Sequence, residues 1–144
     1  MSVSAQQGRS MSMQPLASMP RDNVRGVLTD IDDTLTTHGR LTADAYRAME
    51  RLNDAGMLVV PITGRPAGWC DHIARMWPVA GVVGENGAFW MRHDAGTRRL
   101  VRRFGMDEAE RVANRARLAA IGERILASIK GTALASDQRY RETE

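Results

Sequence analysis

Acidic side chains cluster at one point of the chain, directly after a short apolar run. The string DIDDTLTTHG, Asp30 to Gly39, places Asp30, Asp32 and Asp33 within four positions. Asp30 and Asp32 are two residues apart, so an extended backbone projects both to the same side. Their like charges repel unless a cation lies between them, and Mg²⁺ takes one or two protein carboxylates besides phosphate and water. With the charge neutralised, Asp30 could attack a phosphoryl group while Asp32 transfers a proton.

An acidic string after a strand has two simpler explanations. It can cap the next helix or bind nothing, which is the usual situation for an arbitrary pair of aspartates. It can also begin a calcium-binding loop. With Asp30 in the first position, however, Leu35 stands where glycine is needed and Leu41 where a bidentate glutamate belongs. The calcium loop is therefore excluded, and the capping explanation stays open at this point.

The elements around this string alternate between strand and helix patterns. Val24 to Thr29 is apolar and β-branched, which predicts a buried parallel strand. Residues 41–56 have helical apolar spacing, with Thr42 as the N-cap and Gly56 as the stop. Met57 to Ile62 predicts a second buried strand. Together these segments predict one βαβ unit.

The alternation continues downstream. We expect a helix from Pro66 to Pro78, a strand at Gly81 to Gly84 and then a Gly-Asn turn. An extended segment at Ala88 to Met91 and a hairpin turn at His93 to Thr97 into RRLVRRF should follow. The last expected element is a helix from Asp107 to about Ile129. This order predicts an α/β fold with an open, doubly wound parallel sheet, whose ligands bind beyond the carboxyl ends of the strands. DIDDT and TGR both follow such ends, so we expect them to face one crevice.

Three strings together resemble a known family. VRGVLTDIDDTLT followed by PITGR is similar to the haloacid dehalogenase (HAD) superfamily of phosphohydrolases, whose first motif is DxDxT and whose second is a Thr or Ser after the next strand. GVVGENGAFW resembles the subclass IIB members with a large α/β cap, and the sugar-phosphate phosphatase branch is the most similar. The resemblance covers Val24 to Trp90, and ASDQRYRE resembles cap sequence more loosely. It implies a HAD-like Rossmannoid parallel sheet with the beginning of an inserted α/β cap.

The resemblance also implies catalytic roles. Asp30 would be the nucleophile and a Mg²⁺ ligand. Asp32 would be the general acid and base, and its backbone carbonyl would also bind the metal. The Thr63 hydroxyl and the Gly64 amide would hold the phosphoryl oxygens, which suits donors aimed at developing negative charge. Thr34 is expected to shape the loop.

Two further residues are candidates for substrate binding, each with a simpler alternative. Arg65 could pair with the substrate or be an exposed arginine at the rim of the site. Asn86 could contact the substrate, although a Gly-Asn turn is by itself sufficient reason for an asparagine.

Two family motifs have no evident counterpart in the 144 residues. The third is a lysine and the fourth an acidic pair, whereas Lys130 is the only lysine and follows the long predicted helix. We therefore expect the N-terminal part of a longer phosphatase that is nearly inactive alone. The expected organisation is a disordered tail at 1–22, the N-terminal part of the core at 23–92, and the start of a truncated cap at 93–144.

Composition limits the remaining choices. The formal net charge is +3, Cys70 is the only cysteine, and no apolar run is long enough to span a bilayer. These features predict a cytoplasmic protein with neither nucleic acid nor membrane as partner. The resemblance implies a small phosphorylated metabolite, such as a sugar phosphate, as partner. The expected activity is Mg²⁺-dependent hydrolysis of a sugar phosphate or similar phosphomonoester through an aspartyl-phosphate. The alternatives are a phosphomutase of the same superfamily or a non-catalytic fragment that binds phosphate or nucleic acid through its arginine cluster, which consists of Arg98, Arg99, Arg102 and Arg103.

Overall fold

The structure is a computed structural model that describes residues 13, 15–20 and 22–144. Most of the tail predicted at 1–22 lies outside the described residues. The part that is described includes a single 3₁₀ turn, η1 (Leu16–Ser18). No helix within the described ranges is both long enough and apolar enough to cross a bilayer.

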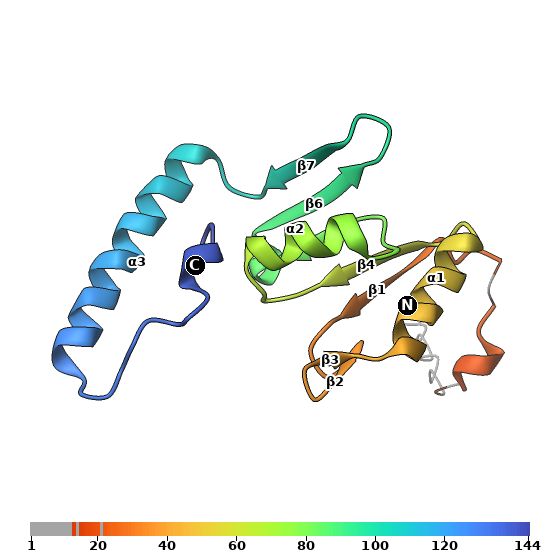
Figure 1. Cartoon of the computed structure of the whole chain (residues 1–144), viewed down its shortest axis with the longest axis horizontal. Helices are drawn as coiled ribbons and strands as arrows, with labels where there is room; N and C mark the ends of the chain where they lie inside the picture. Colours follow the sequence, from red (N-terminus) through yellow and green to blue (C-terminus); the bar gives the residue numbers. More distant parts are fainter. Residues whose placement is uncertain (1–12, 14, 21) are drawn as a thin grey trace, which may run out of the picture.

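A five-stranded sheet in the order β1-β4-β5-β6-β7 forms the centre of the molecule (Figure 1). Its strands are β1 (Gly26–Asp30), β4 (Leu58–Ile62), β5 (Val82–Gly84), β6 (Phe89–Asp94) and β7 (Arg99–Phe104). The first three strands are parallel and the last two are antiparallel. The predicted α/β class with a parallel-containing sheet is therefore confirmed.

Helices connect the parallel strands where the sequence predicts them. α1 (Ala43–Asp54) begins after Thr42, whose side-chain oxygen accepts a hydrogen bond from the Ala45 amide at 3.2 Å. Gly56 follows the end of α1 with a φ of +75°, a conformation that glycine adopts without strain. α2 (Ala67–Met76) begins after Pro66 and ends before Pro78. Both predicted crossover helices are confirmed.

The hydrophobic core lies between the sheet and α2. Cys70 and Ile73 of α2 are buried in one cluster with Val82 of β5 and with Phe89 and Met91 of β6. Strand side chains alternate between faces, and the register pairs Val82 with Met91 and Gly84 with Phe89, so these residues share one face. α1 and α2 lie on the same side of the sheet (Figure 1).

The opposite face of the sheet is largely exposed in the described part of the chain. Leu28, Leu58 and Trp90 are 70%, 56% and 42% exposed. The register pairs Leu28 with Val60 and Val83 with Trp90, which places these side chains on the face away from α2. β1 and β4 were predicted as buried strands, and this is wrong for one of their two faces, because both helices pack on the other.

A long helix follows the sheet and lies apart from it (Figure 1). α3 (Glu108–Ser128) begins at a capping box, in which Asp107 and Glu110 each accept from the other's backbone amide. The predicted N-cap and length are confirmed. No residue of α3 is buried, so its apolar side chains do not contribute to the core.

Two small features complete the fold. β2 (Thr36–Thr37) and β3 (Arg40–Leu41) form a two-stranded hairpin between β1 and α1, which the sequence analysis missed. β6 runs across the predicted boundary at residues 92 and 93, and β7 pairs with it in the same sheet. The division of the chain into tail, core and cap stays a prediction.

Candidate active site

The carboxyl ends of β1 and β4 bring the two predicted motifs together. Asp30 ends β1 and pairs in register with Ile62, the last residue of β4. Thr63, Gly64 and Arg65 therefore begin beside the loop that carries Asp32. The expectation that DIDDT and TGR would share one edge of the sheet agrees with this arrangement.

A tight turn determines how the acidic side chains project. The Ile31 carbonyl accepts hydrogen bonds from the amides of Thr34, Leu35 and Thr36, at 3.3, 3.1 and 2.9 Å, and from the Thr36 hydroxyl at 2.9 Å. Asp33 has a φ of +55°, which aspartate tolerates better than most residues. Ile31 is buried, whereas Asp30 and Asp32 on either side of it are exposed. The turn thus presents both carboxylates to solvent.

An ion pair joins the two motifs directly. Arg65 donates from Nε to both carboxylate oxygens of Asp32, at 3.2 and 3.1 Å, and from Nη2 to Oδ1 at 2.6 Å. These hydrogen bonds raise the pKa of the Arg65 guanidinium. The guanidinium also lies 5.0 Å from the ring centroid of Trp69, whose side chain is half exposed. In this arrangement the Asp32 carboxylate acts only as an acceptor.

The second motif forms a closely packed turn against the loop after β5. Thr63 is almost fully buried, its hydroxyl accepts from the Arg65 amide at 3.0 Å, and its carbonyl accepts from the Asn86 amide at 3.1 Å. A Cβ at Gly64 would lie only 2.9 Å from Asn86 Oδ1. A larger residue at position 64 would therefore have to displace the Asn86 side chain.

The loop after β5 contains a buried acid that the sequence analysis did not single out. Glu85, in η2 (Glu85–Gly87), is 2% exposed and has a φ of +44°, which is unusual for glutamate. Its Oε1 accepts from the Ala67 amide at the start of α2 at 3.0 Å. Asn86 also has a positive φ, of +55°. The ENGA string therefore adopts a special backbone conformation immediately beside Gly64.

Residues 137–144, here called the return segment, come back to this edge of the sheet after α3 (Figure 1). Glu144 Oε1 accepts from the Asn86 side-chain amide at 2.8 Å, and Arg141 Nη1 donates to the Gly64 carbonyl at 3.3 Å. Sequence reasoning missed this contact, and its signal was limited to the loose resemblance of ASDQRYRE to cap sequence. The structure thus brings the predicted Gly64 and Asn86 into contact with Arg141 and Glu144, which were not predicted.

A small cavity adjoins the ion pair. It has a volume of about 110 Å³ and its lining includes Asp32, Arg65, Trp69 and Trp77. Such a volume is below the range of about 300–1,000 Å³ that is usual for drug-sized ligands. The cavity suits a small chemical group, and its polar end is formed by the Asp32–Arg65 pair.

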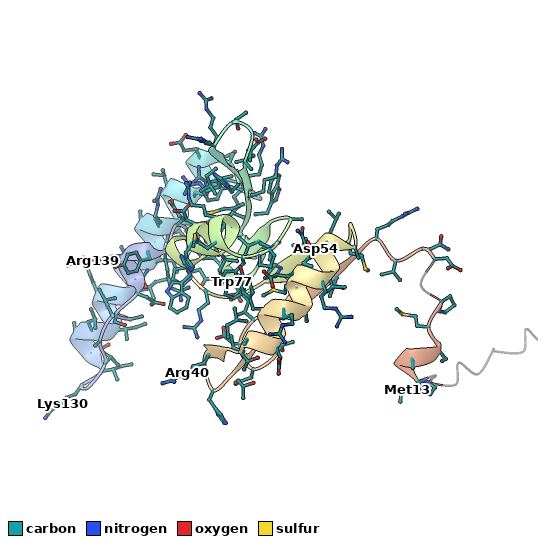
Figure 2. All side chains as sticks on the ribbon, turned by 45° about the vertical axis from the view of Figure 1, so that its right-hand side comes forward. Met13, Arg40, Asp54, Trp77, Lys130 and Arg139 are labelled. Atoms are coloured by element: carbon teal, nitrogen blue, oxygen red, sulfur yellow. The ribbon has the colours of Figure 1, made fainter. Side chains whose placement is uncertain are left out.

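The donor set is compatible with a magnesium ion of the kind the resemblance implies. The Asp30 carboxylate and the Asp32 backbone carbonyl are hard oxygen donors, and Mg²⁺ usually takes one or two carboxylates from a protein together with other oxygens, such as those of phosphate and water. No group of three His, Cys, Asp or Glu side chains arranged to hold a metal occurs among the described residues. Lys130 projects from the far end of α3, well away from Trp77 at the cavity (Figure 2).

Comparisons with known proteins agree with the fold. The family model described as haloacid dehalogenase-like hydrolase matches residues 27–133. A solved phosphatase of the haloalkanoate (HAD) enzyme superfamily from Bacteroides thetaiotaomicron superposes with a TM-score of 0.50 at 23% sequence identity. That match covers 76% of this chain and 40% of the phosphatase. A hypothetical protein from Geobacillus kaustophilus has a TM-score of 0.49 at 21% identity, over 70% of this chain and 36% of that protein.

No curated protein matches the chain. At 23% identity the Bacteroides phosphatase bears on the fold alone. The chain spans about 40% of the length of the Bacteroides phosphatase.

Proposed function

The chain belongs to the haloacid dehalogenase-like hydrolases, and from that premise we propose that it carries the nucleophile and the phosphate-binding turn of a Mg²⁺-dependent phosphatase. The proposed substrate is a sugar phosphate or a similar small phosphomonoester. The observation that carries this proposal is the Asp32–Arg65 ion pair, which joins DIDDT to TGR across 33 positions. Both motifs follow the carboxyl ends of neighbouring parallel strands, which is where ligands bind in open α/β sheets.

The proposed reaction has two steps. Asp30 attacks the phosphorus through a carboxylate oxygen, the bond to the leaving oxygen breaks, and Asp32 gives that oxygen a proton. Water then attacks the aspartyl-phosphate, Asp32 takes the proton of the water, and inorganic phosphate leaves. The Asp30 carboxylate is regenerated. The Thr63 hydroxyl and the Gly64 amide would hold the phosphoryl oxygens during both steps.

Magnesium would be held by Asp30 and by Asp32, through the backbone carbonyl of Asp32. When bound, the ion supplies positive charge that offsets the repulsion between the carboxylates and the phosphoryl group. The protein residues position the group that is transferred.

In this proposal Arg65 changes its partner: it pairs with Asp32 in the free site and with the phosphate when substrate is bound. Asp32 cannot give a proton while its carboxylate accepts three hydrogen bonds from Arg65. A phosphate oxygen offers the same guanidinium an alternative acceptor. Substrate binding would therefore draw Arg65 from Asp32 to the phosphate and leave Asp32 free to carry a proton.

Three further features support a small metabolite in a reducing compartment. The half-exposed ring of Trp69 beside Arg65 offers an apolar surface to a substrate ring. Cys70 is an unpaired, buried thiol, and we propose a cytoplasmic location on that basis. The small cavity beside Asp32 leaves little room for a large leaving group.

Beryllium fluoride, a phosphoryl mimic that bonds to carboxylates, tests the nucleophile independently of turnover. We expect Mg²⁺ with beryllium fluoride to change the tryptophan fluorescence of the full chain, because Trp69 lies beside Arg65. Asp30→Asn should abolish the change. Asp33→Asn is the matched control, because it alters the neighbouring acid at a backbone conformation that asparagine also accepts.

Phosphate release from a panel of sugar phosphates then tests the reaction. Whatever activity the chain has should fall by at least about 10³-fold in Asp30→Asn and persist in Asp33→Asn. A response to beryllium fluoride or a turnover that is equal in the Asp30→Asn variant and the unmodified chain would refute the mechanism.

A further inference from the structure

The buried carboxylate of Glu85 depends on the return segment for most of its hydrogen bonds. Oε1 accepts from the Glu142 amide at 2.8 Å, and Oε2 accepts from the amide and the hydroxyl of Thr143, at 2.7 and 2.5 Å. The only other donor among the described residues is the Ala67 amide. A carboxylate that is 2% exposed loses much free energy without such donors. Glu85 is thus a specific anchor for residues 142 and 143.

From this anchor, neighbouring side chains of the return segment reach the candidate phosphate site. Glu144 accepts from the Asn86 side chain, and Arg141 donates to the Gly64 carbonyl. Arg141 also pairs with Glu144 at 2.8 Å and with Asp137 at 3.6 Å, which ties the two ends of the segment together. The contacts with Gly64 and Asn86 therefore belong to one ordered unit.

The charges of this unit oppose an anionic ligand. The Glu144 carboxylate occupies the Asn86 amide, a donor that could otherwise reach a phosphate oxygen. The positive charge of Arg141 is already shared between two carboxylates of the segment. An incoming phosphate would meet a negative group on Asn86, and the arginine beside it, Arg141, is already paired.

We propose that the return segment is an autoinhibitory latch: Glu85 holds residues 142 and 143, and Glu144 thereby occupies the Asn86 side-chain amide in competition with an anionic substrate, while Arg141 is bound at the Gly64 carbonyl. The proposal rests on the proposed function for its substrate, a phosphate group. The latch itself is intramolecular and rests on the Glu85 contacts. Substrate binding and release of the segment are then linked: a bound substrate favours release of the segment, and the resting contacts weaken substrate binding.

Hydrogen exchange of the Glu142 and Thr143 amides in the full chain measures the latch without any ligand. Glu85→Gln removes one acceptor oxygen and places an amide N–H₂ group against backbone donors. The exchange rate of both amides should therefore rise by about 10-fold. Thr143→Val removes only the hydroxyl donor and leaves the Ala67 contact intact. It should raise exchange by a smaller factor, and it serves where Glu85→Gln fails to fold.

Inorganic phosphate with Mg²⁺ is the probe for competition. We expect phosphate to accelerate exchange at residues 142 and 143, and Glu144→Ala to bind phosphate several-fold more tightly by freeing Asn86. Glu142→Ala is the matched control, because it removes an equal charge from the same segment but its side chain pairs with Arg102, at 2.6 Å. It should bind phosphate much as the unmodified chain does.

The outcomes separate this proposal from the proposed function. Unchanged exchange in both Glu85→Gln and Thr143→Val overturns the latch, whatever the site binds. Equal tightening in Glu144→Ala and Glu142→Ala overturns competition at Asn86, because it indicates a general charge effect. Failure of phosphate to bind even in Glu144→Ala contradicts both the proposed function and the competition, while faster exchange in Glu85→Gln would still establish the anchor.

Discussion

The two faces of the central sheet differ although they are made from the same strands. On the face toward α1 and α2, Val59, Phe89 and Met91 are almost completely buried. On the other face, Leu28 and Trp90 remain largely exposed. Phe89 and Trp90 are adjacent in one strand, so local β-propensity cannot account for the difference.

The comparison shows that the covered face positions Arg65 and Trp69, whereas Asp30 shares its face with Leu28. α2 packs there, and its first turn is held to Glu85 by the Ala67 amide, which places Arg65 and Trp69 beside the acidic loop. The open face supplies no residue to these contacts. We therefore expect substitutions on the covered face to alter both stability and the position of Arg65, and substitutions of Leu28 or Trp90 on the open face to alter neither strongly.

The largest predicted effect comes from a matched pair on β6. Phe89→Ala leaves a cavity beneath α2 and should lower the free energy of unfolding by about 3–5 kcal/mol. Trp90→Ala removes an even larger ring from the open face and should cost less than about 1 kcal/mol. Urea denaturation of the two variants measures both values. Equal losses would show that a partner or another part of the chain covers the open face in solution.

The second prediction uses Cys70 as a probe of the covered face. Burial, and secondarily the negative charge of Glu85, raise the pKa of this thiol to about 12. Since the thiolate is the reactive form, alkylation at pH 8 should be slower than that of a free cysteine by roughly 10³-fold from the pKa alone. Mass spectrometry of the alkylated chain follows the rate. Fast labelling in the folded protein would mean that α2 detaches readily from the sheet.

A smaller effect is expected in α3, which lacks buried residues altogether. Its N-terminus is held by the capping box, so Asp107→Ala should reduce the stability of the helix by about 1 kcal/mol. Circular dichroism should show lost helicity, while urea denaturation of the sheet stays unchanged because α3 does not enter the core. Coupled loss of both signals would indicate that α3 and the sheet unfold as one unit.

The smallest effect concerns the turn between β6 and β7. Hydrogen bonding from Thr97 lowers the pKa of Asp94, with its Oδ1 accepting from the Thr97 amide at 2.9 Å. A lowered pKa means that this contribution is fully present above about pH 4, the ordinary value, and is lost as pH falls through the folded value. NMR should show the Thr97 amide shifting at acid pH. The shift should disappear in Asp94→Asn, and persistence there would assign it to another group.

Local patterns in the sequence predicted most of the elements correctly. Thr42, Pro66 and Asp107 mark the helix starts, and the apolar runs predicted β1 and β4. The meeting of Asp32 with Arg65 followed from topology, because neighbouring parallel strands end at one edge. These inferences needed only short-range signals and one general rule.

Long-range contacts could not be predicted in the same way. Glu85 and Thr143 are 58 positions apart, and nothing in a single sequence marks a buried glutamate as the acceptor for a distant backbone. The exposure of Leu28 was missed because an apolar strand has the same composition whether one face or both are covered. The β2–β3 hairpin was missed because strands of two residues have no detectable periodicity.

Asp30 and Asp32 are two residues apart for a structural reason as well as the proposed chemical one, because Ile31 lies between them. Its side chain is buried in the same cluster as Cys70 and Phe89, while its carbonyl fastens the turn. Inserting or deleting one residue between Asp30 and Asp32 would either eject this side chain from the core or bury a charge in its place. The two-residue interval is therefore protected against length changes by folding itself, so that selection against misfolding would preserve it even in a descendant that no longer used the acids.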